Sequence, residues 1–214
     1  MRRGKFITIE GGEGVGKSTN IATLKETLEA SGIRLVCTRE PGGTPFSEQI
    51  RSVLLEQREE SVEPVAELLL MFAARVQHYR QVIEPALEQG IWVLCDRFTD
   101  ASVAYQGFGR GLGQAFVQAL NELVLDGGCP DLTLLLDLKP ETGRERIGER
   151  GQLDRFEVEQ SAFFERIRAG YLTLAKQEPE RFRVIDASAS LEEVGAAIQR
   201  VIRDYLVSEG LHHR

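Results

Sequence analysis

The stretch Gly11-Gly12-Glu13-Gly14-Val15-Gly16-Lys17-Ser18 decides the fold of this chain. It fits the pattern G-x-x-x-x-G-K-[ST], follows an apolar run at residues 6–9 and precedes a segment whose apolar residues have helical spacing. In such a strand–loop–helix unit the glycines let backbone N–H groups point at a phosphate, and the helix dipole adds positive charge. The stretch therefore predicts a phosphate cradle rather than a turn without a ligand.

Each position of the cradle has an expected part in binding a nucleoside triphosphate. Lys17 is expected to reach the β- and γ-phosphates, and the Ser18 hydroxyl is expected to ligate Mg²⁺. The expected ATP-binding residues of this segment are Gly11, Gly12, Glu13, Gly14, Val15, Gly16, Lys17, Ser18 and Thr19.

The composition is that of one globular domain. The chain has 214 residues, of which 42% are hydrophobic and 28% are charged, and we expect a single domain over residues 1–214. No apolar run approaches the ~18 residues of a membrane span, and residues 1–5 show no cleavable apolar region, so we expect a cytoplasmic protein without a membrane partner. The net charge of −7 argues against a nucleic-acid partner, and three widely spaced cysteines are expected to be reduced.

Apolar runs alternate with helical patterns along the chain. Strands are expected at residues 5–9, 33–38, 91–95, 131–138 and 182–186. Helices are expected at residues 17–31, 44–55, 64–89 with a bend near Pro85, 113–125, 154–177 and 191–207. The glycine-rich residues 107–111 are expected to be flexible. This alternation predicts an α/β fold of three layers, with a five-stranded parallel sheet between helices.

Arginines follow two of the expected strands. Arg39 begins the segment Arg39-Glu40-Pro41-Gly42-Gly43, in which the proline and the glycines turn the chain sharply, and Arg97 follows Asp96 after the third strand. Ligands bind at the carboxyl edge of an open parallel sheet, and guanidinium groups pair with phosphate through two hydrogen bonds. We therefore expect a second, phosphorylated substrate beside the nucleotide, which indicates a kinase. The guanine-reading N-K-x-D or T-K-x-D pattern of GTP-binding switches does not occur.

Several spaced motifs together resemble the thymidylate kinase family over essentially the whole chain. They are the phosphate loop after Ile9-Glu10, Arg39-Glu40-Pro41-Gly42-Gly43, Phe72-Ala73-Ala74-Arg75, Asp96-Arg97, Ala104-Tyr105-Gln106-Gly107 with Arg110, and Arg150-Gly151-Gln152-Leu153-Asp154-Arg155. The resemblance implies the P-loop NTPase fold with a small lid at about residues 142–155, transfer of the ATP γ-phosphate to dTMP to give dTDP and ADP, Mg²⁺ bound with ATP, and a homodimer. Two alternatives stay open: a kinase for another nucleoside monophosphate or a deoxynucleoside, and a nucleotide-binding module without catalysis.

Phosphoryl transfer needs positioning and charge neutralisation, which Lys17, Arg39 and Arg97 are expected to supply as catalytic residues. Asp96 is expected to organise Mg²⁺ and its waters or to hold a neighbouring arginine. No general base is needed, because the acceptor phosphate is already largely dianionic.

The family takes one further catalytic arginine from the phosphate loop or from the lid. Gly14 occupies the loop position and has no side chain, so the lid is expected to provide it. Arg150 is the first candidate for contact with the transferred phosphate, and Arg146, four residues earlier, is a candidate for stacking on the adenine.

The resemblance also implies how thymine is chosen. Phe72 is expected to stack on the base, and Arg75, three residues later, to donate to a base carbonyl. Gln106 is expected to pair with the base edge through its amide, while Ser102 supports either Arg75 or the base.

Two further residues are expected around the sugar. Tyr105 is expected to border it, and Glu10 is expected to accept from its 3′-hydroxyl or to touch Mg²⁺. One departure from the family is Phe98, which follows Asp96-Arg97 where tyrosine or histidine is common. Any polar contact made by that ring is absent here.

Overall fold

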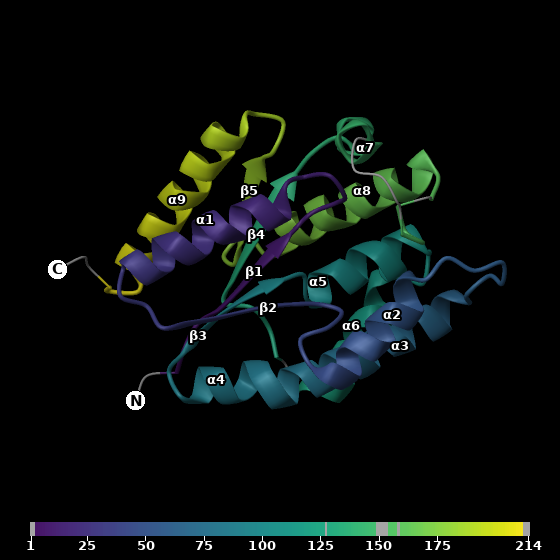
Figure 1. Ribbon diagram of the computed structural model, residues 1–214, viewed down its shortest axis with the longest axis horizontal. Helices are drawn as coiled ribbons and strands as arrows, with labels where there is room; N and C mark the ends of the chain where they lie inside the picture. Colours follow the sequence, from purple (N-terminus) through teal and green to yellow (C-terminus); the bar gives the residue numbers. More distant parts are fainter. Residues whose placement is uncertain (1–2, 127, 149–153, 158, 212–214) are drawn as a thin grey trace.

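The computed structural model describes residues 3–126, 128–148, 154–157 and 159–211. Its centre is a parallel sheet with the strand order β2-β3-β1-β4-β5 (Figure 1). The strands are β1 (Phe6–Glu10), β2 (Leu35–Arg39), β3 (Trp92–Asp96), β4 (Leu132–Asp137) and β5 (Phe182–Asp186). The predicted α/β fold with a five-stranded parallel sheet is confirmed.

The register of the strands brings three expected functional segments to one edge. Asp96 of β3 lies opposite Ile9 of β1 on one side and opposite Arg39 of β2 on the other. The phosphate loop, the Arg39 turn and Arg97 therefore all leave the sheet at the same carboxyl edge, where parallel sheets bind ligands.

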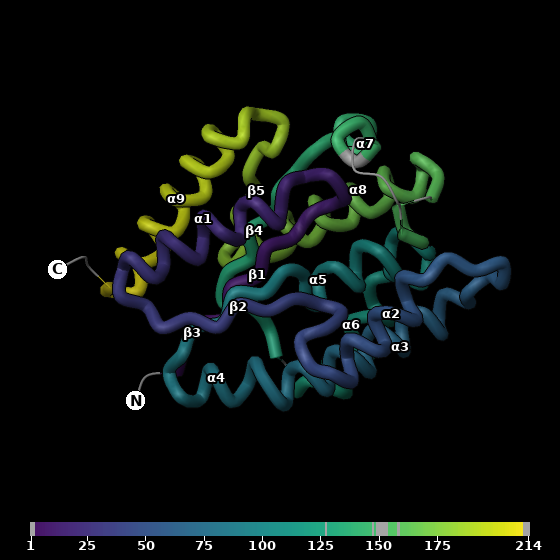
Figure 2. Tube along the Cα trace, in the orientation of Figure 1, coloured from purple at the N-terminus to yellow at the C-terminus, as the bar shows by residue number. Residues whose placement is uncertain are grey.

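Helices cover both faces of the sheet (Figures 1 and 2). On one face α1 (Lys17–Ala30) and α9 (Leu191–Ser208) pack against each other. The other face carries α3 (Pro64–His78), α4 (Glu84–Glu88), α5 (Thr99–Ser102), α6 (Gln114–Leu125) and α8 (Ser161–Gln177), and α2 (Pro45–Leu55) packs on α3. The helix α7 (Pro140–Gly148) follows β4 and lies beside the phosphate loop.

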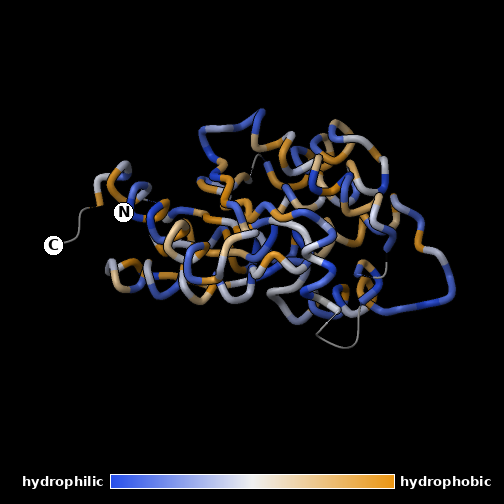
Figure 3. Tube along the Cα trace, turned by 90° about the horizontal axis from the view of Figure 1, so that it is seen from above, coloured by the Kyte–Doolittle hydropathy of each residue, from blue (hydrophilic) through white to orange (hydrophobic). Residues whose placement is uncertain are grey.

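The strands divide their side chains between the two faces. Ile7 and Ile9 of β1 pack under α1 and α9, whereas Phe6 packs on the opposite side with Val93 of β3. This alternation follows from the two-residue period of a strand. Figure 3 shows hydrophobic residues concentrated along the middle of the trace, with the long hydrophilic loop between α2 and α3 at one end. Within the described ranges, no helix has the length and apolar character that crossing a membrane requires.

The expected long helix over residues 64–89 is interrupted before Pro85, as predicted. The turns at Tyr79–Ile83 are π-helical, and α4 begins at Glu84. A proline lacks an N–H group and its ring collides with the carbonyl four residues earlier, so the helix must widen just before it.

Two expectations about local structure are wrong. Residues 107–111 were expected to be flexible, but Gly107 and Gly109 belong to a buried π-helical segment, Val103–Gly109. A Cβ at Gly109 would lie 2.7 Å from the ring of Phe163, so this glycine permits close packing on α8. The helix expected from residue 154 begins at Ser161, because the Asp154 carboxylate accepts from the N–H groups of the next turn instead.

Candidate active site

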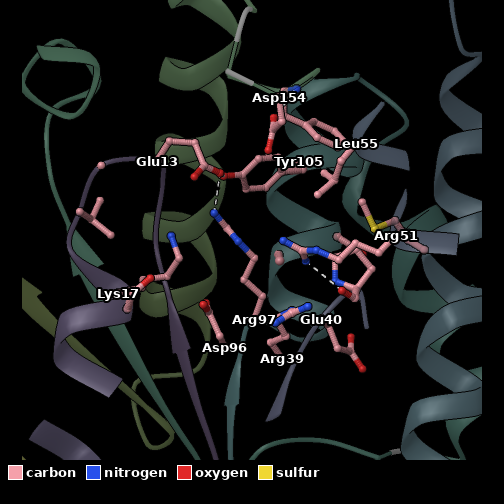
Figure 4. A pocket seen from close by; sticks show the side chains of 18 of the residues that line it. Glu13, Lys17, Arg39, Glu40, Arg51, Leu55, Asp96, Arg97, Tyr105 and Asp154 are labelled. Atoms are coloured by element: carbon pink, nitrogen blue, oxygen red, sulfur yellow. Dashed lines mark hydrogen bonds and ion pairs between the residues drawn. The ribbon is translucent and has the colours of Figure 1, made fainter. Parts of the chain in front are cut away.

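A cavity of about 200 Å³ opens at the carboxyl ends of β1, β2 and β3 (Figure 4). Its wall includes many residues that the sequence singled out. These are Glu13, Gly14, Val15, Gly16, Lys17, Ser18, Thr19, Arg39, Arg75, Asp96, Arg97, Ser102, Tyr105 and Gln106. The expected ATP-binding residues Gly11 and Gly12 line a smaller adjoining hollow.

The phosphate loop turns directly into α1. Gly16 precedes the helix with φ of 87°, a left-handed conformation that glycine adopts without strain. The Lys17 Nζ donates to the carbonyl oxygens of Gly11 and Gly12, at 3.2 and 2.7 Å. Burial and the neighbouring Arg97 lower the pKa of Lys17. The loop thus holds its lysine over its own backbone, at the start of a helix whose dipole favours anions.

Arg97 is fixed by the phosphate loop. Its φ is 67°, an uncommon conformation for a residue with a side chain, and it aims the guanidinium back across β1. The guanidinium donates to the Gly11 carbonyl at 2.9 Å and to the Glu13 carboxylate at 2.6 Å (Figure 4). Its carbon also lies 4.8 Å from the centre of the Tyr105 ring.

The Glu13 carboxylate is ionised in this position. Burial opposes its ionisation, but the charges of Arg97 and Lys17 outweigh burial and lower the pKa of Glu13 to about 2. The Tyr105 hydroxyl donates to the same carboxylate at 2.6 Å. Glu13 therefore positions Arg97 and Tyr105 at the cavity.

Arg39 and a further arginine enter the cavity from the opposite side. Arg39 is half-exposed and pairs with Glu48 of α2 at 2.8 Å. Arg51, also on α2, lines the cavity and donates to the Pro41 carbonyl at 2.9 Å. Sequence reasoning missed Arg51, and its only signal was its place in the helix that follows the Arg39 turn. Burial and the neighbouring Arg39 lower the pKa of Arg51.

Asp96 leaves a buried oxygen for a ligand. Its Oδ1 is buried and has no hydrogen-bond partner among the described residues. Those residues contain no cluster of three or more His, Cys, Asp or Glu side chains that could hold a metal alone. Mg²⁺ commonly uses only one or two protein oxygens together with substrate phosphates. Asp96 and Ser18, both on the cavity wall, therefore fit a Mg²⁺ ion that arrives with ATP.

Arg75 is held rigidly at the other end of the cavity. Its Nε donates to Glu40 at 2.7 Å, and its two terminal nitrogens donate to the Ser102 hydroxyl at 2.9 Å and to the Phe98 carbonyl at 3.0 Å. Ser102 thus contacts Arg75, one of its two expected partners. A guanidinium has five N–H groups, so two remain beyond these three bonds.

The structure does not place Phe72 on the cavity wall. Its ring lies 4.7 Å from the Arg75 guanidinium and belongs to the core between α3 and the Val103–Gly109 segment. The ring packs beneath Arg75 in this arrangement, and its stacking on the base stays a prediction. Phe98 is also buried, with its ring 4.8 Å from that of Phe6, which accounts for an apolar side chain there.

Glu10 also lies beneath the cavity rather than on its wall. Its carboxylate accepts from the N–H of Phe98 and from the Tyr171 hydroxyl, both at 2.7 Å. Burial and the nearby Asp100 raise the pKa of Glu10 to about 8. The structure thus gives Glu10 two protein partners, and its contact with the sugar or Mg²⁺ stays a prediction.

The expected lid is described only in part. Arg146 of α7 donates to the Ala187 carbonyl at 3.0 Å, in the loop that follows β5, and does not line the cavity. Arg150, the first candidate for the transferred phosphate, lies outside the described residues. Asp154 and Phe156, at the end of this region, line the cavity.

Comparisons with known proteins show the family of this chain. A family model described as thymidylate kinase matches residues 9–198. The chain is 56% identical over 198 residues to the thymidylate kinase of Hahella chejuensis (92% of this chain, 95% of the relative) and 57% identical over 198 residues to that of Methylococcus capsulatus (92% and 94%). The crystal structure of thymidylate kinase from Ehrlichia chaffeensis superimposes with a TM-score of 0.75 at 32% identity, covering 94% of this chain and 99% of the other.

Proposed function

This chain belongs to the thymidylate kinase family, and we propose that the cavity at the carboxyl edge of its sheet is where it transfers the γ-phosphate of ATP to dTMP. The chain has the P-loop NTPase fold, and it is an ATP-dependent nucleoside monophosphate kinase. One observation carries the assignment of the cavity. Lys17, three arginines and the unpartnered oxygen of Asp96 meet on a wall that also carries Arg75 and Gln106.

The donor end of the cavity is the phosphate loop. The residues Glu13–Thr19 supply backbone N–H groups and the Lys17 ammonium to the ATP phosphates. Asp96 and Ser18 would hold Mg²⁺, which neutralises charge on the phosphates when it is bound. Arg146 contacts the loop that follows β5, which supports a place for adenine between α7 and that loop.

The acceptor end lies between the Arg39 turn and α2. Arg39, Arg51 and Arg97 approach it from three different segments, so a dTMP phosphate there is opposed by positive charge on several sides. Such charge offsets the repulsion between two polyanions and stabilises the loose transition state. Arg150 is expected to complete this set from the lid.

The base end is formed by Arg75 and Gln106, with Tyr105 between them and the phosphate loop. Arg75 keeps two N–H groups for a base carbonyl, and its three other donors prevent it from turning away. Replacing that carbonyl by the amino group of cytosine would set donor against donor. This arrangement supports thymine as the preferred base.

An apolar surface supports a homodimer. Large hydrophobic side chains are exposed on the packed helices α2, α3 and α6: Phe46, Val53, Val65, Leu69, Phe116 and Leu123. Exposed apolar side chains grouped on neighbouring helices commonly mark a protein interface. We propose that this surface, the α2–α3–α6 face, is covered by a second copy of the chain. We place the enzyme in the cytoplasm, which the three unpaired cysteines Cys37, Cys95 and Cys129 support.

A coupled assay of ADP release tests the proposed function. ATP is supplied with dTMP, dUMP, dCMP, AMP or thymidine, and dTMP should give the highest kcat/KM. A higher value for AMP or thymidine would favour the alternative of a kinase for another substrate. ATP binding without turnover of any acceptor would favour a silent nucleotide-binding module.

A further inference from the structure

Glu67 of α3 is a fully buried carboxylate directly behind the base end of the cavity, with 0% exposure. Two arginines pair with it. Arg110 approaches Oε2 at 3.2 Å, and Arg155, next to the cavity residue Asp154, approaches Oε2 at 2.8 Å. Both guanidinium groups also lie about 4.5 Å from aromatic rings, Arg110 over Phe163 and Arg155 over Phe156. Packing thus holds the carboxylate and its partners in place.

The third partner of Glu67 is Gln106, which lines the cavity. The Gln106 side-chain nitrogen donates to Glu67 Oε1 at 2.9 Å in a buried hydrogen bond. A carboxylate paired with two guanidinium groups only accepts hydrogen bonds. The reverse orientation of the amide would place its carbonyl oxygen against the carboxylate oxygen in a buried setting, which costs free energy. Glu67 therefore allows one orientation of the Gln106 amide.

That orientation turns the carbonyl oxygen of Gln106 away from Glu67. No described residue donates a hydrogen bond to this oxygen, and Gln106 is on the wall of the cavity that also contains Arg75. Thymine carries an N3–H donor beside a carbonyl, and uracil does the same. Cytosine has an acceptor at N3 beside an amino group.

We propose that Glu67 is a positioning residue that orients the Gln106 amide, so that its carbonyl oxygen accepts from N3–H of the base and the site rejects cytosine. The inference rests on the proposed function, in which Gln106 meets the base edge. Arg75 and Gln106 then read adjacent groups with opposite polarity, a donor for the carbonyl and an acceptor for N3–H. A site that pairs with both groups leaves two buried mismatches when cytosine enters.

The test is a set of calorimetric dissociation constants for dTMP, dUMP and dCMP, which do not depend on turnover. In Glu67→Gln the new amide can either donate or accept a hydrogen bond. The Gln106 amide can then flip, so that its NH₂ group and its carbonyl oxygen exchange places. The ratio of the dCMP constant to the dTMP constant should fall at least about tenfold. The ratio for dUMP to dTMP should change by less than about twofold, because uracil keeps N3–H. An unchanged dCMP ratio in a folded variant would overturn the proposal.

Glu159→Gln is the matched control. Glu159 pairs with Arg110 but does not contact Gln106, so this variant removes the same charge from the same network. Both ratios should stay at the wild-type values. If the ratio of the dCMP to the dTMP dissociation constant fell equally in Glu159→Gln and Glu67→Gln, the effect would come from the lost negative charge. That result would overturn the positioning role of Glu67.

The wild-type protein gives a second measurement, which holds even where Glu67→Gln does not fold. The side-chain NH₂ signals of Gln106, identified by their loss in Gln106→Leu, should be slow to exchange with water and should remain so when dTMP binds. Fast exchange, or loss of the protected NH₂ on dTMP binding, would contradict the inference. Absence of dTMP phosphorylation by the wild type would instead contradict the proposed function.

Discussion

Gly14 of the phosphate loop and Gly143 of α7 pack backbone against backbone. A Cβ at Gly14 would lie 2.2 Å from the Gly143 carbonyl oxygen, and a Cβ at Gly143 would lie 2.4 Å from the Glu13 carbonyl oxygen. Gly14 also has φ of 71°, which side chains rarely adopt. The position at which some family members carry an arginine therefore has no room for one while α7 lies on the loop. This contact accounts in physical terms for a glycine at this position, while the supply of an arginine by the lid stays a prediction.

The contact itself can be tested with Gly143→Ala. The added methyl group must push α7 away from the phosphate loop, so the free energy of unfolding should fall by about 1–3 kcal/mol and kcat should fall as well. Urea unfolding and steady-state kinetics measure the two effects. Gly148→Ala is the control, because a Cβ there would meet nothing within 4 Å. Equal free energies of unfolding and equal kcat values in the two variants would contradict a role for the contact between Gly14 and Gly143.

Arg150→Ala should lower kcat by at least ~10²-fold, with a smaller change in the KM for dTMP. The reason is that an arginine supplied to the transferred phosphate acts chiefly in the transition state. Steady-state kinetics with saturating ATP measures both parameters. Arg200→Ala, an exposed arginine on α9, is the control and should keep the wild-type kcat. An unchanged kcat in Arg150→Ala would remove Arg150 from the catalytic set.

The order of substrates should be dTMP, then dUMP, then dCMP. Loss of the 5-methyl group costs about 1–3 kcal/mol of transition-state binding, whereas cytosine also opposes the donors of Arg75. The values of kcat/KM for the three nucleotides, measured on one preparation, give this order directly. Equal values for dTMP and dCMP would refute the role of Arg75.

The raised pKa of Glu10 predicts that the stability of the fold depends on pH. Its pKa is raised from 4.5 to about 8, so between these values the folded state binds a proton that the unfolded state has released. The free energy of unfolding should therefore fall as pH rises through this window, by up to about 1.4 kcal/mol per pH unit from this group. Glu10→Gln keeps an oxygen for the Phe98 N–H but does not titrate. Denaturation of both proteins at several pH values should show that the free energy of unfolding declines less steeply with pH in Glu10→Gln than in the wild type. Parallel curves of the free energy of unfolding against pH would contradict the raised pKa of Glu10.

The proposed homodimer can be tested at Leu69, which is 53% exposed on α3. Leu69→Glu places a charge in the α2–α3–α6 face, so sedimentation or light scattering should show a monomer at concentrations where the wild type is a dimer. Leu191→Glu is the control, because Leu191 is 63% exposed at the start of α9, which covers the other face of the sheet. A wild type that stays monomeric at high concentration would exclude the dimer.

Prediction from the sequence succeeded where the signal is local. The strands lie within about two residues of their expected positions, because apolar runs bounded by turn residues are local patterns. The interruption of the helix before Pro85 was predicted correctly, because a proline disturbs the helical turn directly before it in the sequence. Residues 107–111 were misjudged, because the backbone at Gly109 packs against Phe163 of α8, a contact between segments far apart in the chain.

For the candidate site, the sequence indicated which residues to expect but not how their side chains are oriented. Arg51 gave almost no local signal, and it became part of the cavity only through the packing of α2 beside the Arg39 turn. Phe72 and Glu10 are not on the cavity wall in this structure, and their contacts with the substrate stay predictions. Arg150 stays a prediction, since it lies outside the described residues.

The sequence by itself determined the phosphate loop, the parallel sheet and the sheet edge at which the candidate site lies. Two kinds of pattern are properties of the chain itself: the glycines of the phosphate loop, and the strand-like or helical spacing of the apolar residues. Any compact fold of this chain must satisfy both. Only the tertiary structure decided which groups face the substrates. Gly14 meets Gly143, Glu13 fixes Arg97, and Glu67 orients Gln106, and each pair joins segments far apart in the chain. Such contacts depend on how helices and strands pack together, and local sequence patterns do not encode that packing.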